Sequence, residues 1–491
     1  MKLGNKSMKT NQLRSVVAAV AGAVLLNAMP AMADSTDDIL NALIAKGVLT
    51  EEEGALLQKG RAGEKEAAKK KKDSEIKASF KDGIVFESGD KQHKMSINGR
   101  AQLDYRTFSN EVTGNQAETF DIRRAYLTAK GTFYDTYDFE MTYNGAGSTG
   151  SDLLYAWLNV RWWDQAQFKF GQFKQPFSME ELGSSRFLNF TERSMMTQLV
   201  PAVDRGAQIH GTPFKGVTYA LGVFNGVGIN RGQNNNDTSI DADGKSVTGR
   251  ATVNIAELMD IKDAVYHIGA AYSDTSDNHD VNTFAIRTEG RGSNIFQSTA
   301  PGAVGATNKG YDLKRTGLEG AVAYGPVKFQ SEWIRAEFEP DGNNSLVGGA
   351  PAGQGKDITA WYAAVNWMIT GESYADVYKG GMFGGRMKPK NNFDPKAGKW
   401  GPGAWEIGAR YSKLDASDFK LGAETADVFN GAGENGKFNE ADAWTIGLKW
   451  IPSPNVRFLA NYVTTDMDCV KGFVCTEDKE KAVNLRAQID F

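Results

Sequence analysis

The sequence predicts an all-β protein, a 16-stranded antiparallel transmembrane β-barrel with a short N-terminal helical or coiled-coil periplasmic segment. Three observations predict it. Residues 1–33 read as an export signal, residues 80–491 alternate apolar and polar side chains to the end, and nothing after the signal offers the roughly 20 apolar residues of a spanning helix. A membrane could therefore be crossed only by strands. Residues 34–79 lie between signal and barrel.

The N-terminus has the features of a secretory signal peptide. Basic residues precede an apolar run from Val16 to Leu26, and the small-residue triplet 31–33 follows it. The full chain has a net charge of -4, and removing the signal takes away four basic and no acidic residues, which leaves about -8 (-4 - 4). This charge argues against a nucleic-acid partner.

Residues 34–79 are expected to be helical and charged. Apolar side chains within 37–46 recur at i, i+3 and i+4, and Thr50 with Glu53 forms a capping-box pattern. The lysine run 69–72 is typical of a solvated helix face or a linker. A periplasmic oligomerisation stalk is the alternative.

A period-two alternation runs from about residue 80 to the last residue. In MSINGRAQLDYR (95–106) apolar side chains share one face of a strand and polar ones the other, and AVNLRAQIDF (482–491) repeats the pattern. One face suits lipid and the other water. The aromatic final residue resembles the assembly signature of outer-membrane barrels, which with the signal peptide predicts the outer membrane of a Gram-negative cell. A soluble β-sandwich is the alternative, but large outward side chains such as Trp444 and Trp450 argue against it.

The alternating segments can be counted as strands. They lie near 94–107, 118–131, 137–145, 152–163, 167–173, 206–214, 217–225, 246–256, 265–273, 315–324, 327–338, 357–369, 405–414, 441–451, 456–465 and 482–491. Sixteen is an even number, as a closed bacterial barrel requires. A barrel of this size leaves a water-filled lumen.

The connections alternate between short and long. Short periplasmic turns are expected at 134–136, 164–165, 215–216, 325–326 and 452–454, and long external loops near 226–245, 274–314, 339–356, 415–440 and 464–481. Residues 370–404 do not fit this alternation, because they fall where a short turn is expected yet form a long segment rich in Gly, Lys and Pro. Either this is a periplasmic excursion or the count is off by one hairpin.

The segment GQFKQPFSMEELGSSRFLNFTERS, residues 171–194, interrupts the strands. By the count it follows the fifth strand and forms the third external loop. Folded inward, a loop this long and polar would constrict the lumen. The alternative is an ordinary external loop on the rim.

Two adjacent arginines lie where the alternation of a predicted strand slips. In FDIRRAYLTAKG (120–131) the apolar parity changes between Arg123 and Arg124. A β-bulge there would turn both into the lumen and avoid the cost of about 2–4 kcal/mol for an arginine facing lipid. With Arg100 and Arg250 they would form a set of wall guanidiniums suited to an oxyanion such as phosphate. In the alternative, the arginines are cancelled by the inward acids Asp104, Asp121, Glu140 and Glu406.

The chain resembles the phosphate-selective porin O and P family. The resemblance rests on FKDGIVFESGD leading into INGRAQLDY, on FDIRRAYL, on residues 171–194 and on the terminal strand. It implies a homotrimeric channel in outer-membrane lipid that passes phosphate or related small anions passively, without a cofactor. A general diffusion porin of the same fold is the alternative.

The resemblance also implies functional residues. The anion path and constriction loop of the family are matched here by Arg123, Arg124, Tyr126, Ser184, Ser185, Arg186 and Arg193. Arg186 stands where the phosphate-specific members carry a lysine. Glu181 stands where they carry a basic residue, so it is a candidate modifier of selectivity that would weaken an anion site or pair with it.

Cysteines and histidines bear on the remaining function classes. Cys469 and Cys475 fall in the last external loop, where an exported pair is expected to form a local disulfide. The four histidines are scattered, so no metal site is expected. No Ser-His-carboxylate pattern indicates a catalytic residue, and the protein is not expected to be an enzyme. An outer-membrane enzyme or a structural anchor is the third hypothesis.

Overall fold

The computed structural model describes residues 40–41, 43–109, 118–146, 152–226, 228, 245–276, 283–299, 311–340, 356–418, 438–469 and 478–491. The chain divides into two compact units at the boundary between Glu75 and Ile76. The expected signal peptide lies outside the described residues. Within the described part, no helix is long and apolar enough to cross a membrane.

The main helix of the first unit is α3 (Glu51–Ser74). Its capping box is confirmed, because Glu53 N donates to Thr50 Oγ1 at 3.2 Å and Thr50 N donates to the Glu53 carboxylate at 3.0 Å. The helix ends earlier than expected, since residues 76–80 form a strand rather than a helical continuation. The second unit accordingly begins at Ile76 and not at residue 80.

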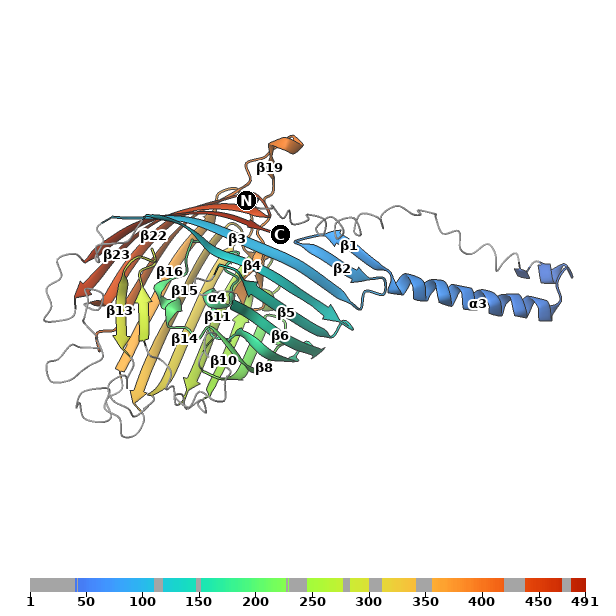
Figure 1. Cartoon of the computed structure of the whole chain (residues 1–491), viewed down its shortest axis with the longest axis horizontal. Coiled ribbons are helices and arrows are strands. Elements are labelled where there is room, and N and C mark those ends of the chain that lie inside the picture. The colour runs from blue at the N-terminus through green and yellow to red at the C-terminus, as the bar shows by residue number, and fades with distance from the viewer. Residues whose placement is uncertain are drawn as a thin grey trace, which may run out of the picture. The chain divides into compact units, whose positions relative to one another are not determined.

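The second unit is a closed antiparallel barrel of sixteen strands (Figure 1). In order these are β3 (Lys94–Ser109), β4 (Thr119–Phe133), β5 (Tyr137–Asn144), β6 (Asp152–Trp163), β7 (Ala166–Lys174), β8 (Val203–Phe214), β9 (Val217–Phe224), β10 (Ser246–Asn254), β11 (Ala264–Thr275), β14 (Tyr311–Tyr324), β15 (Val327–Pro340), β16 (Lys356–Met368), β21 (Ala404–Asp415), β22 (Phe438–Ser453), β23 (Val456–Cys469) and β24 (Lys479–Asp490). Pairing of β24 with β3 closes the barrel, with Asp490 opposite Arg100. The predicted fold class and strand count are confirmed.

A hairpin of β1 (Ile76–Phe80) and β2 (Ile84–Ser88) extends the sheet next to β3, an addition that the strand count missed. The last short turn also differs, because β22 continues through Ser453 and leaves only residues 454–455 between strands.

The connection from β16 to β21 is an excursion and not a missed hairpin of the barrel, because these two strands pair directly. It carries η2 (Ala375–Val377), β17 (Tyr378–Lys379), β18 (Met382–Phe383), β19 (Phe393–Asp394), η3 (Pro395–Ala397) and β20 (Lys399–Trp400). We call residues 369–403 the periplasmic insert. A further one-turn helix, α5 (Ile255–Leu258), lies in the turn between β10 and β11.

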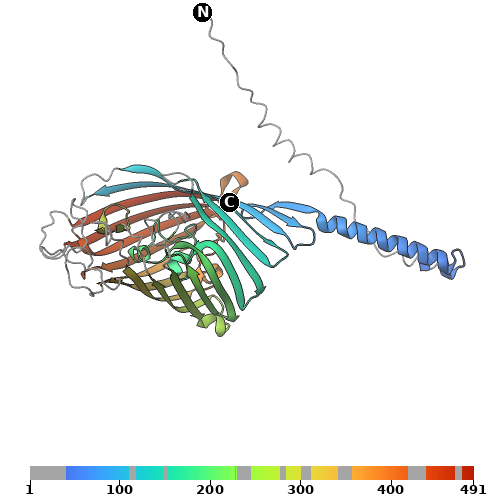
Figure 2. The ribbon, with the colours of Figure 1, turned by 60° about the horizontal axis from the view of Figure 1, so that its bottom comes forward.

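Two external connections fold into the barrel. The inner loop, residues 175–202, carries α4 (Met179–Leu182) and η1 (Met195–Gln198), and the green segment around α4 lies inside the ring of strands in Figure 2. The outer hairpin, residues 283–299, consists of β12 (Thr283–Arg287) and β13 (Asn294–Thr299). Its tip is held by Glu289, which accepts hydrogen bonds from Arg410 at 2.7 Å and Thr445 at 2.6 Å.

A hydrophobic core fills one side of the lumen. Met195, Met196 and Leu199 of the inner loop pack against inward apolar residues of β14 to β23, among them Ile334 and Leu414. Burial of this apolar surface is the driving force that folds the loop inward. The core occupies the β14–β23 side, so open space remains along the wall formed by β3 to β7.

Candidate functional site

The β-bulge expected in β4 is present at Arg123. Gln102 of β3 pairs with Arg124 and Leu103 pairs with Ile122, so Arg123 is the extra residue of the ladder. Both arginines reach the lumen, where their guanidinium groups meet a carboxylate of the inner loop. The bulge therefore places two adjacent cations on the same side of the wall.

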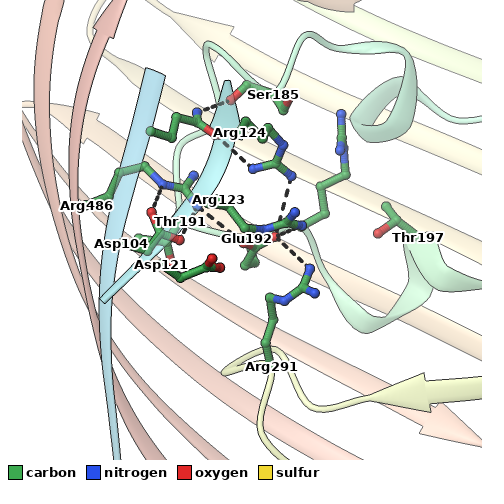
Figure 3. A network of polar contacts seen from close by, with 12 residues as sticks. Asp104, Asp121, Arg123, Arg124, Ser185, Thr191, Glu192, Thr197, Arg291 and Arg486 are labelled. Atoms are coloured by element: carbon green, nitrogen blue, oxygen red, sulfur yellow. Dashed lines mark hydrogen bonds and ion pairs between the residues drawn. The ribbon is translucent and has the colours of Figure 1, made fainter. Parts of the chain in front are cut away.

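That carboxylate, Glu192, is the centre of an arginine cluster that the sequence did not reveal (Figure 3). Arg123 donates from Nε to one carboxylate oxygen at 2.7 Å and from Nη2 to the other at 3.2 Å. Four further guanidinium groups approach within 3.2–4.0 Å, those of Arg106, Arg124, Arg291 and Arg486. We call these five arginines with Glu192, Asp104 and Asp121 the outer cluster.

The outer cluster carries excess positive charge. Five arginines against three carboxylates give +2 (5 - 3), with Asp104 bound at 2.7 Å by Arg486 and Asp121 lying 3.6 Å from Arg106. Burial alone would raise the pKa of Glu192, but Arg123, Arg124 and Arg486 hold it well below its usual range. Glu192 therefore stays ionised and fixes the inner loop to the wall.

A cavity of about 400 Å³ lies between the inner loop and the β3–β7 wall. Its charged lining is Arg100, Lys130, Glu140, Lys169, Lys174 and Arg186, which sums to +4 (5 - 1). Two of these cations also face carboxylates outside the lining, Lys174 with Glu181 at 3.3 Å and Arg186 with Asp490 at 3.8 Å. Arg100 lies over the Tyr126 ring at 4.3 Å, and within the described part of the chain its buried Nε and Nη1 have no hydrogen-bond partner. Lys169 lies over the Trp157 ring at 4.3 Å. We call this space the basic cavity.

Arg186 lies at the border of the basic cavity and a second arginine group. Its Nε is 3.8 Å from Asp490, a carboxylate that also pairs with Arg386 at 2.5 Å and Arg457 at 2.6 Å. Three guanidiniums thus share one carboxylate, and all three lie near the ring of Phe187. On β3, Arg100 and the Arg106 of the outer cluster are six residues apart, or about 20 Å along a strand, so basic groups extend over much of the pore length.

The guanidinium group of Arg193 is hydrogen-bonded to the protein and is not free to bind an anion. Its Nε donates to Glu180 O at 2.9 Å and its Nη2 to Gly183 O at 2.8 Å, which satisfies carbonyl groups at the end of α4. Glu181 pairs with Arg193 at 3.2 Å and with Lys174 at 3.3 Å. The acid that departs from the family pattern is thus neutralised by these two cations and not by Arg186.

Arg250 is also occupied. Its Nε donates to Glu319 at 3.0 Å and its Nη2 to Gly381 O of the periplasmic insert at 2.7 Å. Tyr378 of the insert forms a 2.7 Å hydrogen bond with His267, whose other ring nitrogen lies 3.0 Å from Glu319. These contacts hold the insert inside the lumen, where Met382 and Gly384 line the basic cavity.

The two serines of the inner loop line the basic cavity, but their bonds differ. Ser184 Oγ accepts from Arg186 N at 3.3 Å, and the Ser185 carbonyl accepts from Gln102 Nε2 at 3.0 Å. The predicted residues therefore separate into those that border the cavity and those that brace the loop. Arg100, Tyr126, Ser184, Ser185 and Arg186 border the cavity, whereas Arg123, Arg124, Arg193 and Arg250 bind protein groups.

Two of the inward acids expected to cancel the arginines, Asp104 and Asp121, do pair with arginines, those of the outer cluster. Asp104 binds Arg486 and Arg106, and Glu406 pairs with Lys449 at 2.8 Å. Glu192 adds to this cancellation, and Lys169 of the cavity was missed. Its place in the alternation of the predicted strand 167–173, opposite lipid-facing residues, is the signal that could have found it.

Cys469 at the end of β23 is disulfide-bonded. Cys475 lies outside the described residues.

We expect Glu181→Gln to destabilise the barrel in a pH-dependent way. Burial would raise the pKa of Glu181, but Arg193 and Lys174 lower it, so its stabilising contribution is present above the unfolded-state pKa of about 4.3 and is lost as pH falls through the folded-state value. Thermal unfolding of the wild type and the variant should therefore differ by a constant amount from pH 7 to about 5 and converge below. Glu64→Gln on α3 is the control. Convergence already at pH 7 would contradict the ion-paired state of Glu181.

A sixteen-stranded barrel narrowed by an inward loop has the architecture of an outer-membrane porin. Residues 95–491 match the model of the phosphate-selective porin O and P family. The chain belongs to this family, and it is accordingly an outer-membrane porin.

Individual relatives are more distant. The chain is 27% identical over 421 residues to "Porin O" of Pseudomonas aeruginosa, covering 80% of this chain and 88% of that protein. Among solved structures it is similar to a loop L8 deletion mutant of OmpT from Vibrio cholerae, with a TM-score of 0.47, 11% identity and coverage of 82% of this chain and 100% of the other. The outer-membrane channel DcaP of Acinetobacter baumannii gives a TM-score of 0.47, 10% identity and coverage of 81% and 97%. These structural similarities are weak, and the assignment rests on the family match.

Proposed function

We propose that this porin prefers small anions, with phosphate and related oxyanions as its substrates, and that it acts as a passive homotrimeric channel. The observation that carries the proposal is the basic cavity, whose charged lining sums to +4 and contains the unpaired edge of Arg100. Guanidinium and ammonium groups directed into a narrow aqueous space concentrate anions and exclude cations. The description of the matching family, phosphate-selective porin O and P, supports the anion preference.

Phosphate suits this cavity better than chloride. A planar guanidinium can donate two parallel hydrogen bonds to a pair of phosphate oxygens, while lysines add charge without a fixed direction. Ser184, Ser185 and Tyr126 border the same space and can offer hydroxyl donors. Several weak contacts along the path would let the anion enter and leave.

A general diffusion porin is the second candidate. Several wall cations are bound to carboxylates, as Arg123 is to Glu192 and Arg250 is to Glu319. Such paired charges form a transverse field without strong selectivity. The two candidates differ in whether the unpaired groups of the basic cavity dominate permeation.

We expect the purified protein to be anion-selective in planar bilayers. With a potassium chloride gradient across the membrane, the reversal potential should have the sign of the chloride equilibrium potential. A value near zero would support the general diffusion porin, and the opposite sign would contradict anion preference. Chemical cross-linking in detergent should yield a species of three chains, and a monomer alone would contradict the trimer.

A further inference from the structure

The tip of the periplasmic insert leaves the lumen and forms a small hairpin on the outside of the barrel. Residues 388–402, here called the rim hairpin, contain the pairing of β19 with β20, Phe393 opposite Trp400 and Asp394 opposite Lys399. Gly401 N donates to Asn392 O at 3.1 Å, and Gly403 N to Asn391 O at 3.0 Å. Figure 1 shows β19 standing clear of the barrel strands at the end where the C-terminus lies.

The rim hairpin rests on the lipid-facing side of the strands. Lys449 points into the lumen, where its ammonium donates to Leu188 O of the inner loop at 3.3 Å, so the adjacent Trp450 points outward. The ring of Phe393 packs 5.4 Å from that of Trp450, and Trp450 stacks on Trp405 at 5.5 Å. The hairpin is thus attached to an outward aromatic patch.

Two indole groups fix this attachment. Trp405 Nε1 donates to Pro402 O at 3.0 Å, and Trp450 Nε1 donates to the same oxygen at 2.9 Å. Trp450 lies three residues before the end of β22, and Trp405 is the second residue of β21, so both are at the periplasmic ends of their strands. Tryptophans at this level form the belt that meets the lipid headgroups.

The exposed surface of the rim hairpin is aromatic and basic. Trp400 is 75% exposed, and four lysines against one carboxylate give a charge of +3 (4 - 1). The carboxylate, Asp394, accepts from Ala397 N at 3.2 Å and so stabilises the turn. Lys396 and Lys399 are exposed beside Trp400.

We propose that the rim hairpin docks on anionic phospholipid headgroups of the periplasmic leaflet. An exposed indole beside lysines matches the interface between acyl chains and negatively charged headgroups. A second copy of this chain is a poorer occupant, because subunit interfaces are depleted in lysine whereas headgroup contacts favour it. The docked hairpin ties the outer end of the insert to the membrane, while Gly381 and Tyr378 tie its inner end to the lumen wall.

The test places a fluorophore on the hairpin of the full-length protein in vesicles. Ala397→Cys is labelled at the exposed tip, and quenching is measured with phosphatidylglycerol or phosphatidylcholine that carries a nitroxide on the upper acyl chain. We expect phosphatidylglycerol to quench at a lower mole fraction. The preference should fall about fivefold for each charge removed in Lys396→Gln and Lys399→Gln. Lys396→Arg with Lys399→Arg should keep it.

A control and three outcomes complete the test. Lys94→Gln with Lys262→Gln removes two exposed lysines elsewhere in the second unit and should leave the preference unchanged. The proposal is overturned if neither lipid quenches, which would place the hairpin in water. It is also overturned if both lipids quench equally in the parent, or if quenching appears only after the oligomer is dissociated, which would show that a second copy covers the hairpin.

Discussion

Replacing Arg100 and Lys169 with glutamine is expected to abolish the inhibition of chloride current by added phosphate. Both cations line the basic cavity, and both lie over aromatic rings. Each lost hydrogen bond between charged groups costs about 1.5–3 kcal/mol of binding, which is at least tenfold in affinity per residue. The measurement is the phosphate concentration that halves single-channel chloride current, in the parent and in each variant.

A matched control separates local from general charge effects. Arg161→Gln removes one positive charge that lies outside the basic cavity. The Arg161 guanidinium pairs at 3.2 Å with Asp135, which lies in a short turn. It should leave phosphate inhibition unchanged. If Arg100→Gln with Lys169→Gln were inhibited as strongly as the parent, the basic cavity would not be the site at which phosphate binds.

Glu192→Gln should destabilise the barrel by about 3 kcal/mol or more while keeping or increasing its anion preference. The carboxylate lies among five guanidiniums, and removal of one partner from a buried ion pair leaves uncompensated charge. The charge of the outer cluster would rise from +2 to +3 (5 - 2), which strengthens attraction of anions. Thermal unfolding and reversal potential together give the two results.

Unchanged stability or a loss of anion preference in Glu192→Gln would contradict this role of Glu192. Glu118→Gln is the control, since Glu118 accepts hydrogen bonds from Tyr105 and Thr107 at the exposed external edge. A Glu192→Gln variant as stable as this control, or one that lost anion preference, would show that Glu192 neither anchors the inner loop nor offsets the arginines.

The barrel itself could be predicted because each strand carries its own local signal. Alternation gave all sixteen strands, and the slip between Arg123 and Arg124 located the bulge seen against Gln102 and Leu103. The length of residues 171–194 marked a loop with a role of its own, and that loop lies in the lumen. These features depend on side-chain parity within one segment.

The hydrophobic core in the lumen depends instead on a change along single strands, where the inward side chains are polar at one end and apolar at the other. On β15, Lys328, Gln330 and Glu332 face inward near the periplasmic end, whereas Ile334 and Phe338 face inward near the external end. Arg335, between these last two, faces outward and pairs with Glu337 at 3.1 Å. A strand prediction that looks only for alternation over the whole segment does not detect this change. The residues at which it occurs can nevertheless be read from the sequence.

Partner choice among the charged groups could not be predicted, because it is set by contacts between segments far apart in the chain. Glu192 meets Arg123 across 69 residues and Arg486 across 294. The periplasmic insert is a stronger case, since its Gly-rich sequence has no periodicity and its inward placement depends on Arg250, His267 and Tyr378. No pattern in the sequence indicated that these three residues would lie near one another.

The position of a bound oxyanion tests the central claim most directly. Crystals of the wild-type protein soaked in arsenate, a heavier analogue of phosphate, would give an anomalous difference map with a peak for each ordered anion. The basic cavity predicts a peak within hydrogen-bond distance of Arg100 and near Lys169. A map whose only peaks lie outside that cavity, or one with no peak in the lumen, would contradict it.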